Sequence, residues 1–189
     1  MTETQSALLQ KAWDAFASAL RARHDPFRQA VLANTSTDGQ PLARVVVVRA
    51  FDPQARLVLI HADHRSPKIG QFMDDPRAAL CTYDAERQLQ VRLHGKITVH
   101  HNDALALSRF AALATMSKLA YAETIGSSIE CAAPHQNTST PLTDADAANN
   151  MAVLAFHFDS AEILELHHAG HQRLRVAFNP ELRASWLTP

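Results

Sequence analysis

The stretch ARVVVVRAFDPQARLVLIHADHRSPKIGQF, residues 43–72, decides the fold class of this chain. It contains two apolar runs rich in β-branched residues, separated by the short turn sequence DPQA. Such runs with a proline-containing turn between them are typical of neighbouring antiparallel strands. The second run ends where a serine precedes a proline, a pair suited to the N-cap and first position of a helix. We therefore predict two strands followed by a short helix.

Outward from this stretch, the rest of the chain alternates between strand and helix patterns. Residues 4–23 carry apolar side chains at helical spacing, and Pro26 ends that helix because it disfavours helical backbone at the residue before it. Short apolar runs up to residue 100, separated by polar turns, predict antiparallel strands that close into a barrel. Residues 102–114 are helical in composition, and the chain returns to strand from residue 151.

These patterns predict one domain over residues 1–189, mostly β with flanking helices. Residues 1–25 form its N-terminal helix, and residues 26–100 form the barrel core. Residues 131–150 are polar and poor in large apolar side chains, so we predict a mobile surface loop there.

The overall composition excludes several classes of protein. The net charge of −1 gives no basic excess for nucleic acid, and no apolar run is long enough to span a membrane. Cys81 and Cys131 form no paired motif, which argues against a disulfide framework and a cysteine zinc site. The polar, acidic N-terminus does not fit a signal peptide. We expect a cytoplasmic protein with no nucleic-acid or membrane partner.

Charged residues gather at the expected start of the helix within residues 62–72. Ser66 and Pro67 favour a helix N-terminus, whose backbone donors and dipole attract an anion. Arg65 and Lys68 flank it and can bind the same anion. The alternative is a charged turn in contact with solvent.

The strand ARVVVVRA adds two more cations. Arg44 and Arg49 are five residues apart, so on a regular strand they point to opposite faces of the sheet. The four valines between them predict a strand buried on both faces, and an arginine at its edge needs an anionic partner. Alternatively, both arginines reach solvent at the strand ends. Gln90, in the strand RQLQVRLHGKI, offers a donor and an acceptor to a flat heterocycle, or is an exposed strand residue.

The 11 histidines suggest a metal site, but their pattern argues against one. His167, His168 and His171 lie close together in the sequence. On a strand, however, His167 and His168 point to opposite faces, and no nearby carboxylate completes a set of metal ligands. No nucleophile elbow, Walker A motif, zinc-protease motif or dinucleotide fingerprint is present. We predict no metal.

The order of four segments resembles the pyridoxamine 5′-phosphate oxidase family, and in particular its short, divergent FMN-binding members. The segments are DPFRQAVLANTSTDGQPLARVVVVRAFD, LIHADHRSPKIGQFMDDPRAALCTYD, RQLQVRLHGKI and HQRLRVAFNPELRASWL. The resemblance implies an FMN-binding split β-barrel, a six-stranded antiparallel Greek-key barrel. It also implies a homodimer with two flavin sites at the subunit interface.

The resemblance assigns roles to particular residues. Arg65, Ser66 and Lys68 correspond to the family's phosphate motif; Pro67 replaces an arginine there, and Arg65 can supply the missing guanidinium. The other implied flavin contacts are Arg44, Arg49, the backbone of Val45 and Val46, Gln90 and His167. Ser127 or Ser128 stands in for a Gln-Ser pair that the partner subunit offers in the family.

The substrate half of the family's site is less complete. Of three helical residues that hold the substrate phosphate, aligned with Arg109, Leu113 and Ser117, only the serine remains. Arg173 and Arg175 stand where the family has an Arg-x-His pair. The implied function is an FMN-dependent oxidoreductase on an unidentified small substrate, inefficient on pyridoxamine phosphate. No catalytic acid or base is identified. Alternatives are a flavin carrier or sensor, or a haem protein with His167 or His171 as axial ligand.

Overall fold

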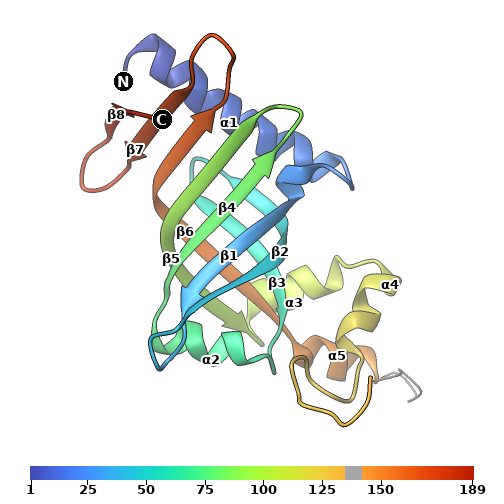
Figure 1. Ribbon diagram of the computed structural model, residues 1–189. Helices are drawn as coiled ribbons and strands as arrows, with labels where there is room; N and C mark the ends of the chain where they lie inside the picture. The colour runs from blue at the N-terminus through green and yellow to red at the C-terminus, as the bar shows by residue number, and fades with distance from the viewer. Residues whose placement is uncertain (135–141) are drawn as a thin grey trace.

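The structure, a computed structural model, describes residues 1–134 and 142–189 (Figure 1). The strands are β1 (Gln29–Thr35), β2 (Pro41–Asp52), β3 (Leu57–Asp63), β4 (Arg77–Asp84), β5 (Leu89–His101), β6 (Met151–Glu165), β7 (Gln172–Ala177) and β8 (Arg183–Leu187). The helices are α1 (Glu3–Arg21), α2 (Pro67–Asp74), α3 (Ala104–Ala111), α4 (Thr115–Lys118) and α5 (Asp144–Asn150), with 3-10 turns η1 (Pro26–Arg28) and η2 (Leu119–Tyr121).

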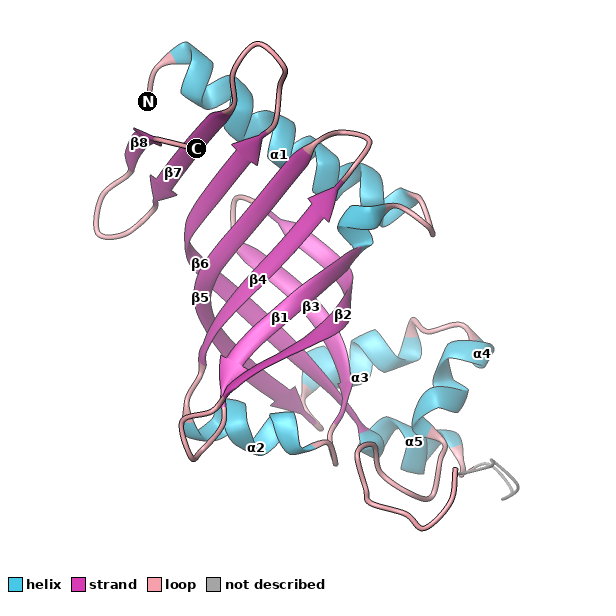
Figure 2. Cartoon of the chain, in the orientation of Figure 1, coloured by secondary structure: helices cyan, strands magenta, loops and turns pink. Residues whose placement is uncertain are grey.

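Six strands form a closed antiparallel barrel. Their order is β3-β2-β1-β4-β5-β6, and pairing of β3 with β6 closes the ring. Strands β7 and β8 extend the sheet beyond β6. Helix α1 lies across one end of the barrel and α2 across the other, as Figure 2 shows. The predicted barrel with flanking helices is confirmed, and β8 is an additional strand that the sequence patterns did not predict.

Helix α1 closes its end of the barrel with aromatic side chains. Phe16 stacks on Phe51 of β2, and Trp13 contacts Phe158 of β6. The helix begins with a capping box in which Thr2 and Gln5 bond each other's backbone. The predicted apolar face of the N-terminal helix is therefore confirmed as part of the core.

Helices α3 and α5 lie against the outside of the barrel at β6, and α4 packs on α5 and η2. A second apolar cluster there joins Phe110 and Tyr121 to Leu59, Met151 and Val153. Since residues 59, 151 and 153 point outward from β3 and β6, the two strands are buried on both faces at this point. This packing holds η2 and the segment after it beside β3, next to the place where β2 and β3 separate.

The barrel splits between β2 and β3, and this split creates the site. The two strands pair only from Val48 to Asp52 of β2, with a bulge between Val48 and Ala50. Residues 41–47 of β2 pair with β1 alone, while residues 61–63 of β3 pair with β6. The backbone edges that face the split are therefore available to a ligand.

The environment of the valine-rich strand differs from the prediction. Val48 is buried, but Val45 is 65% exposed, so the strand is not buried on both faces in a single chain. Arg49 occupies the bulge, where two residues of one strand face one residue of the other. Arg44 and Arg49 were predicted to point to opposite faces of the sheet, but both side chains line one pocket.

A second bulge lies in β6, where Asp159 is the extra residue opposite the step from His94 to Gly95 of β5. A Cβ atom on Gly95 would lie 2.0 Å from the carbonyl oxygen of His157, so only glycine allows β6 to approach this closely. The bulge bends the two longest strands of the barrel.

The segment 131–150 is only partly as predicted. Residues 144–150 form α5 rather than loop, because Thr143 caps the helix and accepts a bond from the Asp146 N–H. Asp144 and Asp146 also place negative charge at the positive end of the helix dipole. The part of the predicted loop at residues 135–141 lies outside the described residues. No described helix has the length and apolar character needed to cross a membrane.

Candidate functional site

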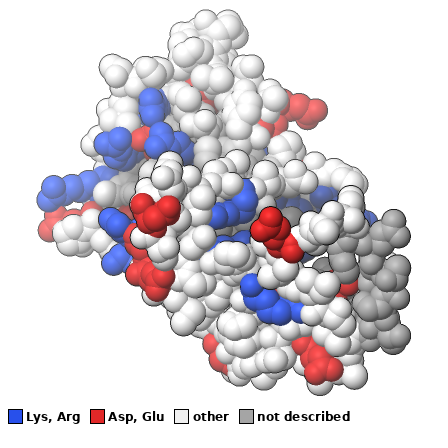
Figure 3. Space-filling view, turned by 60° about the horizontal axis from the view of Figure 1, so that its bottom comes forward, with Lys and Arg blue, Asp and Glu red and all other residues white. Residues whose placement is uncertain are grey.

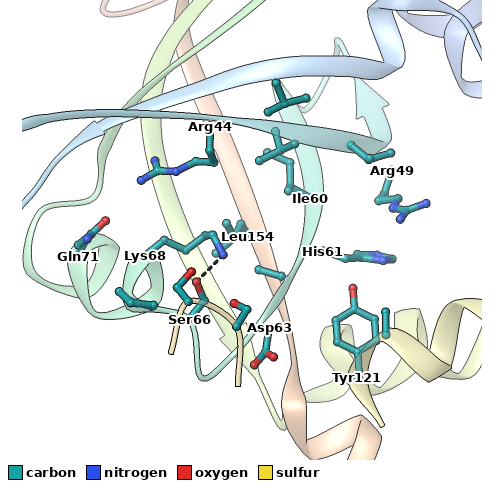
Figure 4. A pocket seen from close by; sticks show the side chains of 18 residues that line it. Arg44, Arg49, Ile60, His61, Asp63, Ser66, Lys68, Gln71, Tyr121 and Leu154 are labelled. Carbon is teal, nitrogen blue, oxygen red and sulfur yellow. Dashed lines mark hydrogen bonds between the residues drawn. The ribbon is translucent and has the colours of Figure 1, made fainter. Parts of the chain in front are cut away.

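A pocket of about 650 Å³ lies where β2 separates from β3. Its walls come from β2, β3, the first turn of α2, η2 and the segment at Ser127 and Ser128. Figure 4 shows two groups of polar side chains in it, with Arg44, Lys68 and Ser66 on one side and Arg49, His61 and Tyr121 on the other. On the face in Figure 3, acidic and basic side chains are interspersed, without a continuous basic band.

Two cations form the first group. Lys68 donates to the Ser66 hydroxyl at 2.6 Å, and Arg44 donates to the side-chain oxygen of Asn34 and the carbonyl oxygen of Leu32. Burial lowers the pKa of Lys68, and nearby Arg44 lowers it further. Burial also lowers the pKa of Arg44. Within the described residues, no ion pair joins either cation to a carboxylate. Two desolvated cations so placed favour a bound anion.

The start of α2 strengthens this preference. Ser66 occupies the N-cap and Pro67 the first helical position, as predicted. The Ser66 side chain makes no capping bond, because its oxygen instead accepts from Lys68. The first-turn backbone donors of the helix and the ammonium of Lys68 therefore lie beside the same part of the pocket.

Arg65, for which the resemblance implies a phosphate contact, does not line the pocket. Its guanidinium binds Asp63 with two bonds, Nε to Oδ1 at 3.0 Å and Nη2 to Oδ2 at 2.8 Å. It also donates to the carbonyl oxygen of Glu123 at 2.8 Å. A Cβ on Gly126 would lie 2.9 Å from the Cβ of Arg65, so the loop packs directly on this side chain. Arg65 thus fastens the loop that brings Ser127 to the pocket.

Asp63 completes this attachment. Its burial acts to raise the pKa of the carboxyl, but bonds from Arg65 and from the Ser127 N–H outweigh burial and lower it. The Asp63 carboxylate is therefore ionised, and the guanidinium of Arg65 compensates its negative charge. Among the described residues, the positive charges of Arg44 and Lys68 remain uncompensated in the pocket.

The second polar group contains His61, which the sequence patterns did not single out. Burial, with Arg49 and Arg109 nearby, lowers the pKa of its imidazole to about 4. Burial also raises the pKa of Tyr121, whose hydroxyl points toward His61 in Figure 4. Strand alternation places His61 and Asp63 on one face, but no local signal relates them to Tyr121, about 60 residues later.

The predicted site residues separate into two sets. Those that line the pocket are Arg44, Val45, Val46, Arg49, Ser66, Lys68 and Ser127. Those that lie elsewhere in the same chain are Arg65, Gln90, Ser117, His167, Arg173 and Arg175. The pocket thus brings together the motifs of β2 and α2, while Gln90 of β5, His167 in the turn after β6, and Arg173 and Arg175 of β7 lie outside it.

Arg173 and Arg175 lie on the outer face of the sheet around Glu162. Arg173 binds this carboxylate at 2.6 Å, Arg175 at 3.1 Å and Arg92 of β5 at 3.2 Å. Burial acts to raise the pKa of Glu162, but the three guanidinium groups lower it overall. One carboxylate faces three arginines, so this face carries excess positive charge.

His167 lies in the turn between β6 and β7. Its Nδ1 atom accepts from the backbone of Ala169, and the Nδ1 of His171 accepts from the backbone of His167. In residues 1–134 and 142–189, no group of three His, Cys, Asp or Glu side chains is placed to hold a metal ion.

Ser117 is separated from the residues with which it was aligned. Helix α3 ends at Ala111 and α4 begins at Thr115, so Arg109 and Ser117 belong to different helices. The spacing of four residues along one helix, on which the alignment depended, is not formed.

Comparison with known proteins supports the resemblance seen in the sequence. Residues 10–101 match the family described as pyridoxamine 5′-phosphate oxidase, FMN-binding domain. A pyridoxine/pyridoxamine 5′-phosphate oxidase from Nostoc sp. is 33% identical over 87 residues, which cover 46% of this chain and 39% of the relative. The corresponding enzyme from Myxococcus xanthus is 39% identical over 67 residues, covering 35% and 32%. The match therefore spans well under half of these relatives.

Solved structures resemble the whole described fold. A pyridoxamine 5′-phosphate oxidase-related, FMN-binding protein from Nostoc punctiforme has a TM-score of 0.78 at 20% identity, covering 100% of this chain and 99% of that one. PhzG from Burkholderia lata, solved with tetrahydrophenazine-1-carboxylic acid, has a TM-score of 0.73 at 17% identity, covering 97% and 92%. At these identities the likeness establishes the shared barrel fold.

Proposed function

Because residues 10–101 are related to the FMN-binding domain of the pyridoxamine 5′-phosphate oxidase family, we propose that the pocket between β2 and β3 binds FMN. The observation that carries this proposal is the pair of partly buried cations, Arg44 and Lys68, that have no carboxylate partner within the described residues. The phosphate of FMN is an anion that suits this pair and the adjoining start of α2.

The side chains present fit each part of the cofactor. Lys68, Ser66 and Arg44 would hold the phosphate. The free edge of β2 at Val45 and Val46 would present backbone donors and acceptors to the polar edge of the ring. FMN, when bound, supplies the capacity to accept and donate electrons, and the protein supplies position and charge. Arg49 would place positive charge near the ring, where it favours the reduced, anionic form.

We further propose that the protein is an oxidoreductase with an unidentified small substrate and little activity on pyridoxamine phosphate. The break between α3 and α4 supports the second part, because Arg109 and Ser117 cannot form the helical phosphate cradle expected of the vitamin enzyme. A flavin carrier or sensor would use the same cofactor pocket and differ only in lacking turnover.

A second copy of the chain would complete the site. Val31, Val45 and Tyr83 are apolar and 40%, 65% and 46% exposed on the outer face of β1, β2 and β4. Gln90 and Arg175 lie on the continuation of this face, on β5 and β7. We propose that this face forms a homodimer interface, through which residues implied by the resemblance but absent from the pocket approach the partner's flavin.

The test of the cofactor proposal is direct. The purified protein is examined by absorption spectroscopy and mass spectrometry for bound flavin, and the flavin-free protein is titrated with FMN by calorimetry. Flavin bands and saturable binding are expected. Protein that carries no flavin and takes up none would overturn the proposal, and a Soret band would point to haem instead.

A further inference from the structure

The Arg49 end of the pocket lies across from the cations assigned to the flavin phosphate (Figure 4). We call it the His61 subsite, formed by Arg49 on the β2 bulge, His61 on β3 and Tyr121 on η2, all of which line the pocket. Arg109 of α3 contributes positive charge nearby. These four side chains come from four elements, so the subsite is a product of the fold rather than of one motif.

His61 is unusual within this subsite. Both of its ring nitrogens are buried, and neither has a hydrogen-bond partner among the residues that the structure describes. The backbone of His61 is fixed in the strand ladder opposite Val153 of β6. A buried polar group without a partner costs about 1–3 kcal/mol, and native proteins keep few of them. An unpaired imidazole in a pocket wall therefore indicates a role with a ligand.

The charges around His61 define the chemistry of that ligand. Arg49 and Arg109 are cations, and burial with these two charges lowers the imidazole pKa to about 4. Tyr121 has a raised pKa and stays neutral, while Asp63 on the same strand is paired with Arg65. Val153, the neighbour on β6, is apolar. At neutral pH the subsite is thus positive through its arginines and holds an uncharged imidazole.

We propose that the His61 subsite binds a small organic anion, such as a carboxylate, and that this anion is taken up together with a proton on His61. This anion is the class of substrate that we assign to the same pocket. Its role as a substrate rests on the oxidoreductase function proposed above, whereas its binding does not. Burial and the positive potential of the two arginines together keep the imidazole neutral, and an anion beside Arg49 cancels the second of these effects. The protonated ring then gains a charged acceptor for the N–H groups that lacked one, so binding and protonation favour each other.

Proton uptake can be measured without knowing the natural ligand. Benzoate serves as the probe and is titrated by calorimetry between about pH 5.5 and 8, where its own carboxyl stays ionised. Two buffers with different ionisation enthalpies report the number of protons taken up. We expect uptake approaching one proton at the acidic end, and an affinity that falls with rising pH by at most about tenfold per pH unit.

Variants distinguish His61 from the rest of the pocket. His61→Asn and His61→Gln are expected to bind benzoate more weakly, without proton uptake and with an affinity independent of pH. Lys68→Ala, at the opposite side of the pocket, is expected to retain the uptake. His94→Asn, on the outside of β5, is the matched histidine control. In the unmodified protein, the ring carbon shift of His61 measured by NMR should titrate at a higher pH when benzoate is present.

Three results would overturn the proposal: no benzoate binding, binding without proton uptake, or unchanged pH dependence in both His61 variants. The titrations are run with and without added FMN. If FMN fails to bind while benzoate is taken up with a proton, the flavin proposal alone fails.

Discussion

Arg65 binds Asp63 through two parallel hydrogen bonds of 3.0 and 2.8 Å, and this pair directs its guanidinium away from Lys68, three residues later. The sequence predicts that both cations bind one anion, but in the structure they have different contacts. Lys68 faces the pocket, and Arg65 holds the loop that carries Ser127.

Replacement of Lys68 should selectively weaken the binding of phosphorylated flavin. A charge-assisted hydrogen bond contributes about 1.5–3 kcal/mol, so Lys68→Ala should lower FMN affinity roughly tenfold to a hundredfold. Riboflavin lacks the phosphate, and its affinity should change little. Fluorescence titration with both flavins measures the ratio, and Lys96→Ala, an exposed lysine on β5, is the control. Equal losses for both flavins would contradict a phosphate contact.

Replacement of Arg65 should affect both flavins alike. Arg65→Ala removes the partner of Asp63 and releases the loop at Glu123, so it should weaken FMN and riboflavin by the same factor. The free energy of unfolding should also fall by about 1–3 kcal/mol because a half-buried carboxylate loses its bonds. Chemical denaturation provides this measurement. A loss confined to FMN would restore Arg65 as a phosphate ligand.

Gly95→Ala should destabilise the barrel. The added Cβ would lie 2.0 Å from the backbone oxygen of His157, which cannot move aside without breaking the β5–β6 ladder. We expect a loss of about 1–3 kcal/mol in the free energy of unfolding. Gly70→Ala in α2 is the matched control, since its Cβ would meet nothing within 4 Å. Equal stability of the two variants would mean that the strands can separate at the bulge.

Glu162→Gln should destabilise the protein in a pH-dependent way. The folded-state pKa of Glu162 is lowered, so its carboxylate contributes stability above about pH 4.5, and this contribution disappears as pH falls through the lowered pKa. At neutral pH we expect a cost of about 1–3 kcal/mol relative to the wild type, shrinking in acid. Glu181→Gln is the control because its ion pair with Arg183 is largely exposed. A cost that does not change with pH would exclude the charge as its origin.

Val31→Asp should disrupt the proposed dimer. Val31 pairs with Val45 on one side and Cys81 on the other, at the centre of the exposed apolar face. Light scattering after gel filtration should give a dimer for the wild type and a monomer for the variant. Leu182→Asp, which is 58% exposed between β7 and β8, should stay dimeric. A monomeric wild type would rule out a flavin site shared between subunits.

The sequence by itself determined the elements within residues 43–72 and the pairing of Ser66 with Lys68 at the cationic end of the pocket. Residues 43–72 form strand, turn, strand and helix because β-branched runs, proline and a serine N-cap act over a few residues. Ser66 and Lys68 meet for the same reason, since they occupy neighbouring positions at a helix start. In both cases, interactions between residues close in the sequence are sufficient to determine the structure.

Only the tertiary structure decided which distant residues share the pocket. Val45 is exposed on the outer face of β2, a strand whose valines predicted burial on both faces, and Arg65 turns to Asp63 and Glu123 instead of the pocket. His61 meets Tyr121 through the packing of η2 on the barrel, while Arg173 and Arg175 gather on Glu162 at another face. Strand register, bulges and long-range packing determine such contacts, and short-range sequence patterns do not encode them.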